Sequence, residues 1–128
     1  MDGKDDFDVQ FFLPYLLNQA SEVASGGFQK IYKDSYGMLR TDWRVLFHLG
    51  IYGRMTARDI GRMAQVHKTK ISRAVARLEA RRFLLREEDA ADRRVEHLTL
   101  TSAGQAAYRD LRGVARNYEA RLVAGLDP

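Results

Sequence analysis

The sequence predicts a mainly α-helical fold with one small β-hairpin, and three observations lead to this prediction. Apolar residues recur three or four positions apart over most of the chain, as they do on one face of an α-helix. Two short runs containing Leu or Val, 84–88 and 95–100, flank a polar segment at 89–94, which is the pattern of a β-hairpin. A turn at 65–67 separates two helical segments ahead of that hairpin, and this order is typical of a helix-turn-helix.

The first predicted helix covers 12–36. Pro14 fits its first turn, where a missing N–H costs little, and Gly37 is expected to end it. Gly26 and Gly27 form a weak point at which a bend is expected. A helix this long with a wide apolar face exceeds what a small domain needs for its own core, so we expect it to contact a partner.

Two shorter helices are expected next. The second covers 41–49, with the Thr41 hydroxyl as its N-cap and with Gly50 and Gly53 at its end. The third follows Thr56, which is expected to cap it, and it ends just before the turn that precedes the fourth helix.

A fourth helix is predicted over 68–82, and a last helix opens at Ser102, where Ser102 and Gln105 match a capping box. The complete order of elements is that of a winged helix-turn-helix with a helical extension at each end. In this interpretation residues 1–128 form a single domain. Its parts are a DNA-binding lobe at 38–101 and helical dimerisation extensions at 1–37 and 102–128.

The composition excludes several classes of function. The chain contains no cysteine, which rules out disulfides, thiolate nucleophiles and iron–sulfur clusters. Its three histidines lack the spacing of metal ligands, so we expect neither a metal nor a cofactor. Its apolar runs are too short to span a bilayer and its N-terminus is acidic, unlike a secretory signal. We therefore expect a cytoplasmic protein without a membrane partner.

Basic residues are concentrated in one part of the chain. Residues 54–94 hold 12 Lys and Arg against 6 Asp and Glu, a net charge of +6, whereas the whole chain carries only +4. A basic segment with slightly acidic surroundings favours a module with one face that meets a polyanion. The alternative is a solvated surface that is rich in arginine.

The helix predicted over 68–82 has one apolar face and one basic face. Ile71, Ala74, Val75 and Leu78 lie within a narrow arc and are expected to pack on the third helix. The opposite face holds Thr69, Lys70, Arg73, Ala76, Arg77 and Ala80. One such helix fits the major groove of B-DNA, which is about 12 Å wide. The predicted DNA contacts on this helix are Lys68, Thr69, Lys70, Ser72, Arg73 and Arg77.

The alternative for this helix is a surface position at which arginine only maintains solubility. Such a face usually mixes both signs of charge. Glu79 is the single acid between Lys68 and Arg86, against seven basic residues, and this imbalance favours contact with DNA.

The polar segment between the two strands is the second candidate for DNA contact. Arg93 and Arg94 at its tip are predicted to enter a minor groove, where narrow A·T segments attract arginine. Phosphate would repel Asp92, so we expect this carboxylate to orient an arginine by a paired hydrogen bond. The alternative is a charged turn without a partner.

Three blocks of the sequence resemble the MarR family of bacterial regulators. Asp92-Arg93-Arg94, followed by 98–101 (Leu-Thr-Leu-Thr) and Gly104, is similar to the family's wing signature of Asp-x-Arg, Leu-Thr and Gly. The run 68–79 is similar to its recognition helix. The run 41–46 resembles the start of its second helix.

The resemblance implies a homodimer that binds a pseudo-palindromic DNA operator. Each recognition helix would enter a major groove and each wing arginine a neighbouring minor groove, with Arg94 as the wing-tip arginine and Asp92 as its brace. Such proteins usually repress nearby genes and release DNA when a small, often aromatic, molecule binds.

The resemblance also implies a pocket where the dimerisation helices meet the DNA-binding lobe. The candidate ligand contacts are Tyr15, Trp43, Phe47 and His48, and the alternative for each is a place in the core. The family normally continues with a further helix, whereas here 126–128 reads only as the start of one. Either the sequence is truncated, or dimerisation relies on the first helix and the helix that opens near Ser102.

Two other functional classes fit less well. An enzyme needs a convergent set of titratable groups, and Asp89 and Asp92 lie on an exposed loop beside arginines. The sequence shows no Ser/His/Asp order and no glycine-rich phosphate loop, so we expect no enzymatic activity. A winged helix that binds proteins instead of DNA is the remaining alternative.

Overall fold

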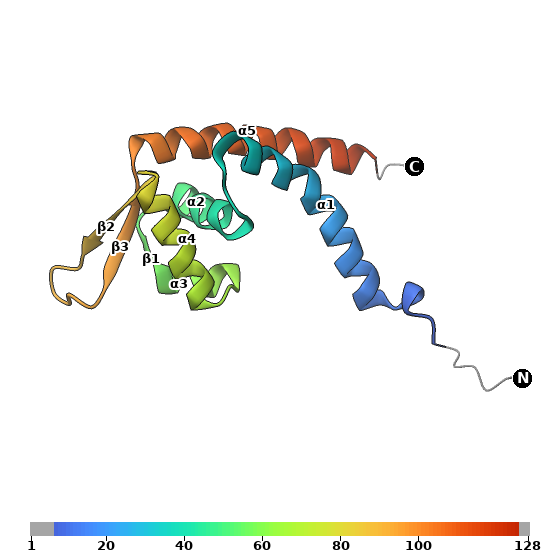
Figure 1. The fold of residues 1–128 in the computed structure, drawn as a ribbon, viewed down its shortest axis with the longest axis horizontal. Helices are drawn as coiled ribbons and strands as arrows, with labels where there is room; N and C mark the ends of the chain where they lie inside the picture. Colours follow the sequence, from blue (N-terminus) through green and yellow to red (C-terminus); the bar gives the residue numbers. More distant parts are fainter. Residues whose placement is uncertain (1–6, 126–128) are drawn as a thin grey trace, which may run out of the picture.

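A computed structural model gives the structure of residues 7–125 (Figure 1). The elements in chain order are a short 3-10 helix η1 (Val9–Phe11), α1 (Leu13–Tyr36), α2 (Arg40–Tyr52), β1 (Met55–Thr56), α3 (Ala57–Ala64), α4 (Lys68–Ala80), β2 (Leu84–Glu88), β3 (Glu96–Leu100) and α5 (Ser102–Ala124). The predicted fold class is confirmed: a helix-turn-helix and a hairpin lie between two long helices. The run 126–128, in which the sequence suggests the start of a further helix, lies outside the described residues.

Helix α1 runs through Gly26 and Gly27 as one continuous element. The ring of Tyr118 on α5 lies against Gly27, and its hydroxyl donates a 2.6 Å hydrogen bond to the carbonyl oxygen of Ala24. Gly37 ends the helix with a φ of +63°, as predicted. The N-terminal half of α1 extends away from the rest of the molecule (Figure 1).

Helix α2 begins one residue earlier and ends three residues later than predicted. Thr41 lies inside the helix, so its role as N-cap is wrong. The Asp42 carboxylate accepts the N–H of Leu39 at 3.0 Å and closes the first turn instead. Gly50 also lies inside the helix, where the Tyr108 ring of α5 packs directly on it, and Gly53 ends the helix as predicted.

The cap of α5 is Thr101 and not Ser102. The Thr101 hydroxyl accepts the N–H of Gly104 at 3.0 Å and donates to the carbonyl oxygen of Arg82 at 2.7 Å. One side chain therefore starts α5 and holds the turn between α4 and β2. Arg82 has a φ of 64°, which ends α4 at Ala80, two residues earlier than predicted.

A three-stranded antiparallel sheet supports the hairpin, in the order β1-β3-β2. Strand β2 has the predicted bounds, and β3 begins one residue later than predicted, because the N–H of Val95 donates to Asp92 within the loop. Strand β1 was not predicted, since two residues are too few for a periodic pattern. In this fold the hairpin and the pair α3–α4 project on the side opposite α5 (Figure 1).

The core lies between α2, α4, α5 and the sheet. The predicted inner face of α4 is confirmed, with Ile71, Ala74, Val75 and Leu78 each at most 1% exposed. The other fully buried large side chains are Tyr32, Met38, Val45, Leu46, Leu49, Ile60, Leu84, Leu98 and Leu111. Burial of one face of α4 fixes which of its side chains point outward.

Candidate nucleic-acid interface and ligand cavity

The outer face of α4 presents cations to solvent. The side chains of Lys68, Thr69, Lys70, Ser72 and Arg73 are all exposed, as the helical periodicity predicts. Within residues 7–125, neither Lys70 nor Arg73 takes part in an ion pair. Helix α4 therefore carries positive charge that the described part of the protein does not neutralise.

Arg77 is the exception, because its guanidinium is paired with a carboxylate from another helix. Its Nε and Nη2 donate to Oδ1 of Asp42 at 2.9 and 2.7 Å. Asp42 lies on α2 and is 2% exposed. A buried carboxylate is stable only with such partners, because leaving a charge unpaired in the interior costs several kcal/mol. Arg77 therefore fastens α4 to α2.

A groove of about 650 Å³ between α3 and α4 adds cations that the sequence analysis missed. Arg58 and Arg62, which were not predicted, line it together with the predicted Lys68, and Nη2 of Arg62 lies 2.9 Å from Oδ1 of Asp59. Arg58 and Arg62 are four residues apart on α3, so they share one helix face. Their spacing in the sequence was therefore enough to predict that Arg58 and Arg62 form one basic face.

We call β2, β3 and the loop between them (residues 89–95) the wing, and that loop the wing loop. At the tip of the wing, Asp92 holds Arg94 by the paired hydrogen bond that the sequence predicts. Oδ1 of Asp92 accepts the backbone N–H and the Nε–H of Arg94 at 3.0 and 3.1 Å, and Oδ2 lies 3.3 Å from Nη2. The hydrogen bonds from Arg94 lower the pKa of Asp92, with the larger effect from its side chain and the smaller from its backbone N–H. The Arg94 side chain is 90% exposed, and Arg93 beside it is exposed as well.

A second site is a cavity of about 570 Å³ that lies between α1, α2 and α5 and opens to solvent. Six aromatic side chains line it: Phe28, Tyr32, Trp43, Phe47, Tyr108 and Tyr118. The Trp43 ring meets the rings of Phe28 and Phe47 edge-on, with centroids 5.3 and 5.1 Å apart. Of the four sequence candidates for a ligand site, Trp43 and Phe47 are therefore part of one cavity.

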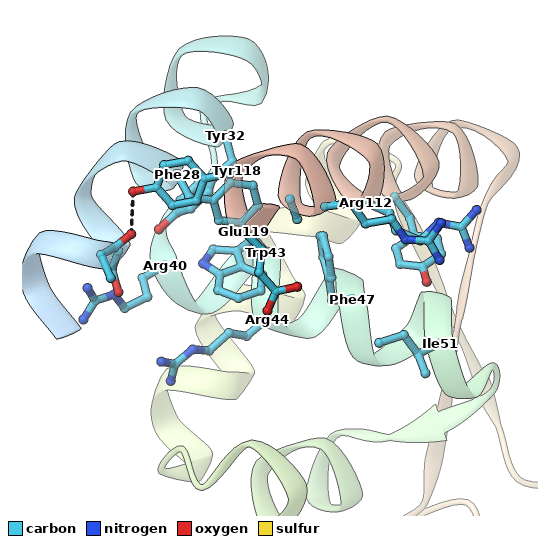
Figure 2. A pocket seen from close by; sticks show the side chains of 15 residues that line it. Phe28, Tyr32, Arg40, Trp43, Arg44, Phe47, Ile51, Arg112, Tyr118 and Glu119 are labelled. Carbon is cyan, nitrogen blue, oxygen red and sulfur yellow. Dashed lines mark hydrogen bonds between the residues drawn. The ribbon is translucent and has the colours of Figure 1, made fainter. Parts of the chain in front are cut away.

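Four arginines and one acid give the cavity a positive rim. The arginines are Arg40 and Arg44 on α2 and Arg112 and Arg116 on α5, and the acid is Glu119. Figure 2 shows Arg40 and Arg44 extending to one side of the aromatic rings and Arg112 to the other. Burial raises the pKa of the Tyr32 hydroxyl in this wall, against the smaller opposite effects of Trp43, Arg40 and Arg44. Both arginine pairs are spaced by four residues, a signal that the sequence analysis did not use.

Tyr15 and His48 lie outside this cavity, which corrects the prediction that they line it together with Trp43 and Phe47. Tyr15 lies in the extended N-terminal half of α1 and accepts a 3.0 Å hydrogen bond from Gln19. Nδ1 of His48 lies 2.7 Å from the carbonyl oxygen of Arg44, so the ring folds back along α2, beside Tyr52.

Comparison with known proteins identifies the family. Residues 36–95 match the profile of the MarR family. The crystal structure of the MarR family transcriptional regulator SPO1453 from Silicibacter pomeroyi DSS-3 has a TM-score of 0.83 to this chain and 31% sequence identity, over 94% of this chain and 85% of that one. The chain belongs to the MarR family.

Two further relatives are similar to this MarR-family chain. Bordetella bronchiseptica BpsR, whose DNA binding is regulated by 6-hydroxynicotinic acid, has a TM-score of 0.85 and 25% identity over 97% of this chain and 88% of that one. The uncharacterized HTH-type transcriptional regulator YwaE of Bacillus subtilis strain 168 is 25% identical over 92 residues, which are 72% of this chain. The match covers 54% of YwaE, so the chain spans about half of the length of that relative.

The structure gives physical reasons for parts of the MarR wing signature in this chain. Asp92 holds Arg94 through three hydrogen bonds. Gly104 lies where any Cβ atom would collide with the carbonyl oxygen of Phe83. Of these two signature positions, Asp92 orients the arginine at the wing tip, and Gly104 allows α5 to pack closely against the turn before β2.

The described part of this MarR-family chain holds neither a membrane-crossing helix nor a metal-binding cluster. Among residues 7–125, no helix combines the length and apolar character that crossing a bilayer requires. The same residues contain no group of three or more His, Asp or Glu side chains arranged to hold a metal ion.

Proposed function

We propose that this protein is a cytoplasmic, sequence-specific regulator that binds double-stranded DNA as a homodimer and represses transcription. One observation carries the proposal. Helix α4, with its exposed Lys70 and Arg73, and the wing that carries Arg93 and Arg94 lie on the side of the lobe opposite α5 (Figure 1). A surface with this charge and shape suits a duplex, whose phosphates attract it and whose major groove accepts one helix.

Each part of this surface has a distinct role in the proposed complex. Lys70 and Arg73 reach base edges from α4 in the major groove, while Lys68, Thr69 and Ser72 contact phosphates near the start of the helix. Arg58 and Arg62 contact the phosphate backbone beside them. Arg94, oriented by Asp92, enters the adjacent minor groove, with Arg93 next to it.

The second half of the proposal is that a small aromatic anion binds the cavity and releases the DNA. An aromatic ring suits the six rings of the cavity wall, and a carboxylate suits its arginine rim. Helix α2 supplies part of this wall and also holds α4 through the Asp42–Arg77 pair. A shift of α2 on ligand binding would therefore move the recognition helix. The regulation of BpsR by an aromatic acid supports this half of the proposal.

The DNA half is tested with an operator selected from random sequences. Arg73→Ala should weaken binding to that operator by about 1–3 kcal/mol and relax its specificity. Arg109→Ala is the matched control, because it removes the same charge from an exposed position on α5, the helix on the far side of the lobe (Figure 1). Equal loss of affinity for operator and random DNA would make Arg73 a phosphate contact. Wild-type binding by the Arg73 variant would contradict the placement of α4 on DNA.

The ligand half is tested by titrating aromatic carboxylic acids into the protein–operator complex. Acids should release the operator at lower concentrations than the corresponding amides, because only the acids carry a charge for the arginine rim. Arg44→Gln should raise the concentration needed for half-release about tenfold, since a hydrogen bond to a charged group contributes about 1.5 kcal/mol or more. Equal potency of acids and amides would contradict the role of the rim. Release by neither would remove the aromatic-anion proposal and leave the DNA half intact.

A further inference from the structure

The wing loop is tied to the sheet through one carboxylate. Oδ1 of Asp89 lies 2.9 Å from Nε2 of His97, which is on β3. Oδ2 of Asp89 accepts the backbone N–H groups of Ala91 and Asp92, both at 3.0 Å. Asp89 thereby connects a strand of the sheet to the backbone of Asp92 at the wing tip.

The same set of bonds continues to the exposed arginine. Asp92 holds the guanidinium of Arg94 from both carboxylate oxygens. The backbone closes the loop around them, with the N–H of Asp89 donating to Val95 at 2.9 Å and the N–H of Val95 donating to Asp92 at 3.0 Å. The direction of the Arg94 side chain therefore depends on Asp92, and the position of Asp92 depends on Asp89. We call His97, Asp89, Asp92 and Arg94 the wing network.

His97 is the fixed end of the wing network. Its side chain is 22% exposed, and it pairs across the sheet with Thr56 on β1 and Glu87 on β2. Glu87 is itself 3.9 Å from Arg54. The bond to His97, followed by the two backbone N–H groups, lowers the pKa of Asp89, so this residue is a carboxylate at neutral pH.

We infer that Asp89 and His97 are positioning residues for the wing arginine: they fix the direction in which Arg94 meets DNA and make no contact with DNA themselves. The inference rests on the proposed wing contact. A side chain as exposed as Arg94 has many conformations to lose on binding, and holding it in advance reduces this loss. A network that orders the loop before DNA arrives should therefore strengthen the minor-groove contact.

The test compares two versions of the selected operator, one with A·T-rich and one with G·C-rich flanks. His97→Ala should lower affinity about 3–10-fold for the A·T-rich version, which is the range expected for freeing one side chain, and should leave the G·C-rich version unaffected. His97→Gln should restore most of the affinity, because its amide nitrogen can donate to Asp89 from a similar place. In combination with Arg94→Ala, the His97→Ala change should cause no further loss, since both act on one contact.

Two controls keep the test decisive. Asp89→Ala breaks the network at a second point, and thermal unfolding reports whether each variant is folded. Glu87→Ala removes a neighbouring charge outside the network, and its effect should not depend on the flanks.

If Arg94→Ala shows flank-dependent loss while His97→Ala and Asp89→Ala bind as the wild type does, the inference is wrong and the wing contact stands. Losses from His97→Ala and Arg94→Ala that multiply would also overturn it. An Arg94→Ala variant indifferent to the flanks would overturn the wing contact and this inference together.

Discussion

At the scale of single residues, two arginines one helical turn apart on α4 have different roles. Arg73 is exposed, whereas Arg77 is held by Asp42, a residue 35 positions earlier in the sequence. Helical periodicity placed both arginines on the outer side of α4, but it contains no information about which acid from another helix reaches them. The basic face of α4 was therefore predictable, and the pairing of Arg77 with Asp42 was not.

Arg77→Ala should destabilise the fold by about 3 kcal/mol, the lower end of the range for breaking a buried pair, because Arg77 itself is 39% exposed. Among residues 7–125, Asp42 would then keep only the N–H of Leu39 as a hydrogen-bond donor. Urea denaturation measures the change, and Arg73→Ala is the control, with an expected change below about 0.5 kcal/mol for an exposed position. An Arg77→Ala protein of wild-type stability that has lost operator affinity would return Arg77 to the DNA-binding set.

At the scale of elements, the close packing of α5 against the turn before β2 depends on a missing side chain. Gly104 lies on the carbonyl oxygen of Phe83, whereas Gly113 on the same helix has nothing within 4 Å of the place where a Cβ would be. Gly104→Ala should cost about 1–3 kcal/mol, because backbone must move to admit the methyl group. Gly113→Ala should stabilise α5 by up to about 1 kcal/mol through helix propensity. Chemical denaturation of both variants checks the opposite signs, and a neutral Gly104→Ala would contradict the packing described.

Most elements were predictable from the sequence because their signals are local. The α4 pattern and the Gly37 and Thr56 caps involve residues within one or two turns of each other. The predictions of helix ends were wrong where a residue far away in the sequence contacts the end of the helix. Thr101, whose hydroxyl also donates to the carbonyl oxygen of Arg82, caps α5 in place of Ser102, and Gly50 lies inside α2 with the Tyr108 ring of α5 packed on it. The cavity was only half predictable for the same reason, since its walls come from three helices.

At the scale of the whole molecule, α1 and the end of α5 leave apolar surface exposed. Leu16, Val23 and Leu122 line a shallow hollow between these helices, and Val23 is 79% exposed. Monomeric proteins rarely leave such a surface uncovered, so it suits the interface with a second copy that the proposed homodimer requires. Two copies joined there would each present α4 and a wing to one duplex.

This arrangement gives the last prediction. The wild-type protein should sediment as a dimer and protect two half-sites about 10 base pairs apart, one helical turn, because each α4 occupies one major groove. Leu16→Glu together with Val23→Glu should yield a folded monomer. Dimerisation would bury the two introduced carboxylates at the interface without positively charged partners, which is unfavourable. Leu85→Glu is the matched control: Leu85 is 58% exposed on β2, and the same substitution there should leave sedimentation unchanged.

The monomeric variant should also lose much of its affinity for the full operator, because the two half-sites then bind separate molecules and no longer share one association event. A wild-type protein that remains monomeric at concentrations that saturate the operator, with a footprint over one half-site, would contradict both the interface and the homodimer.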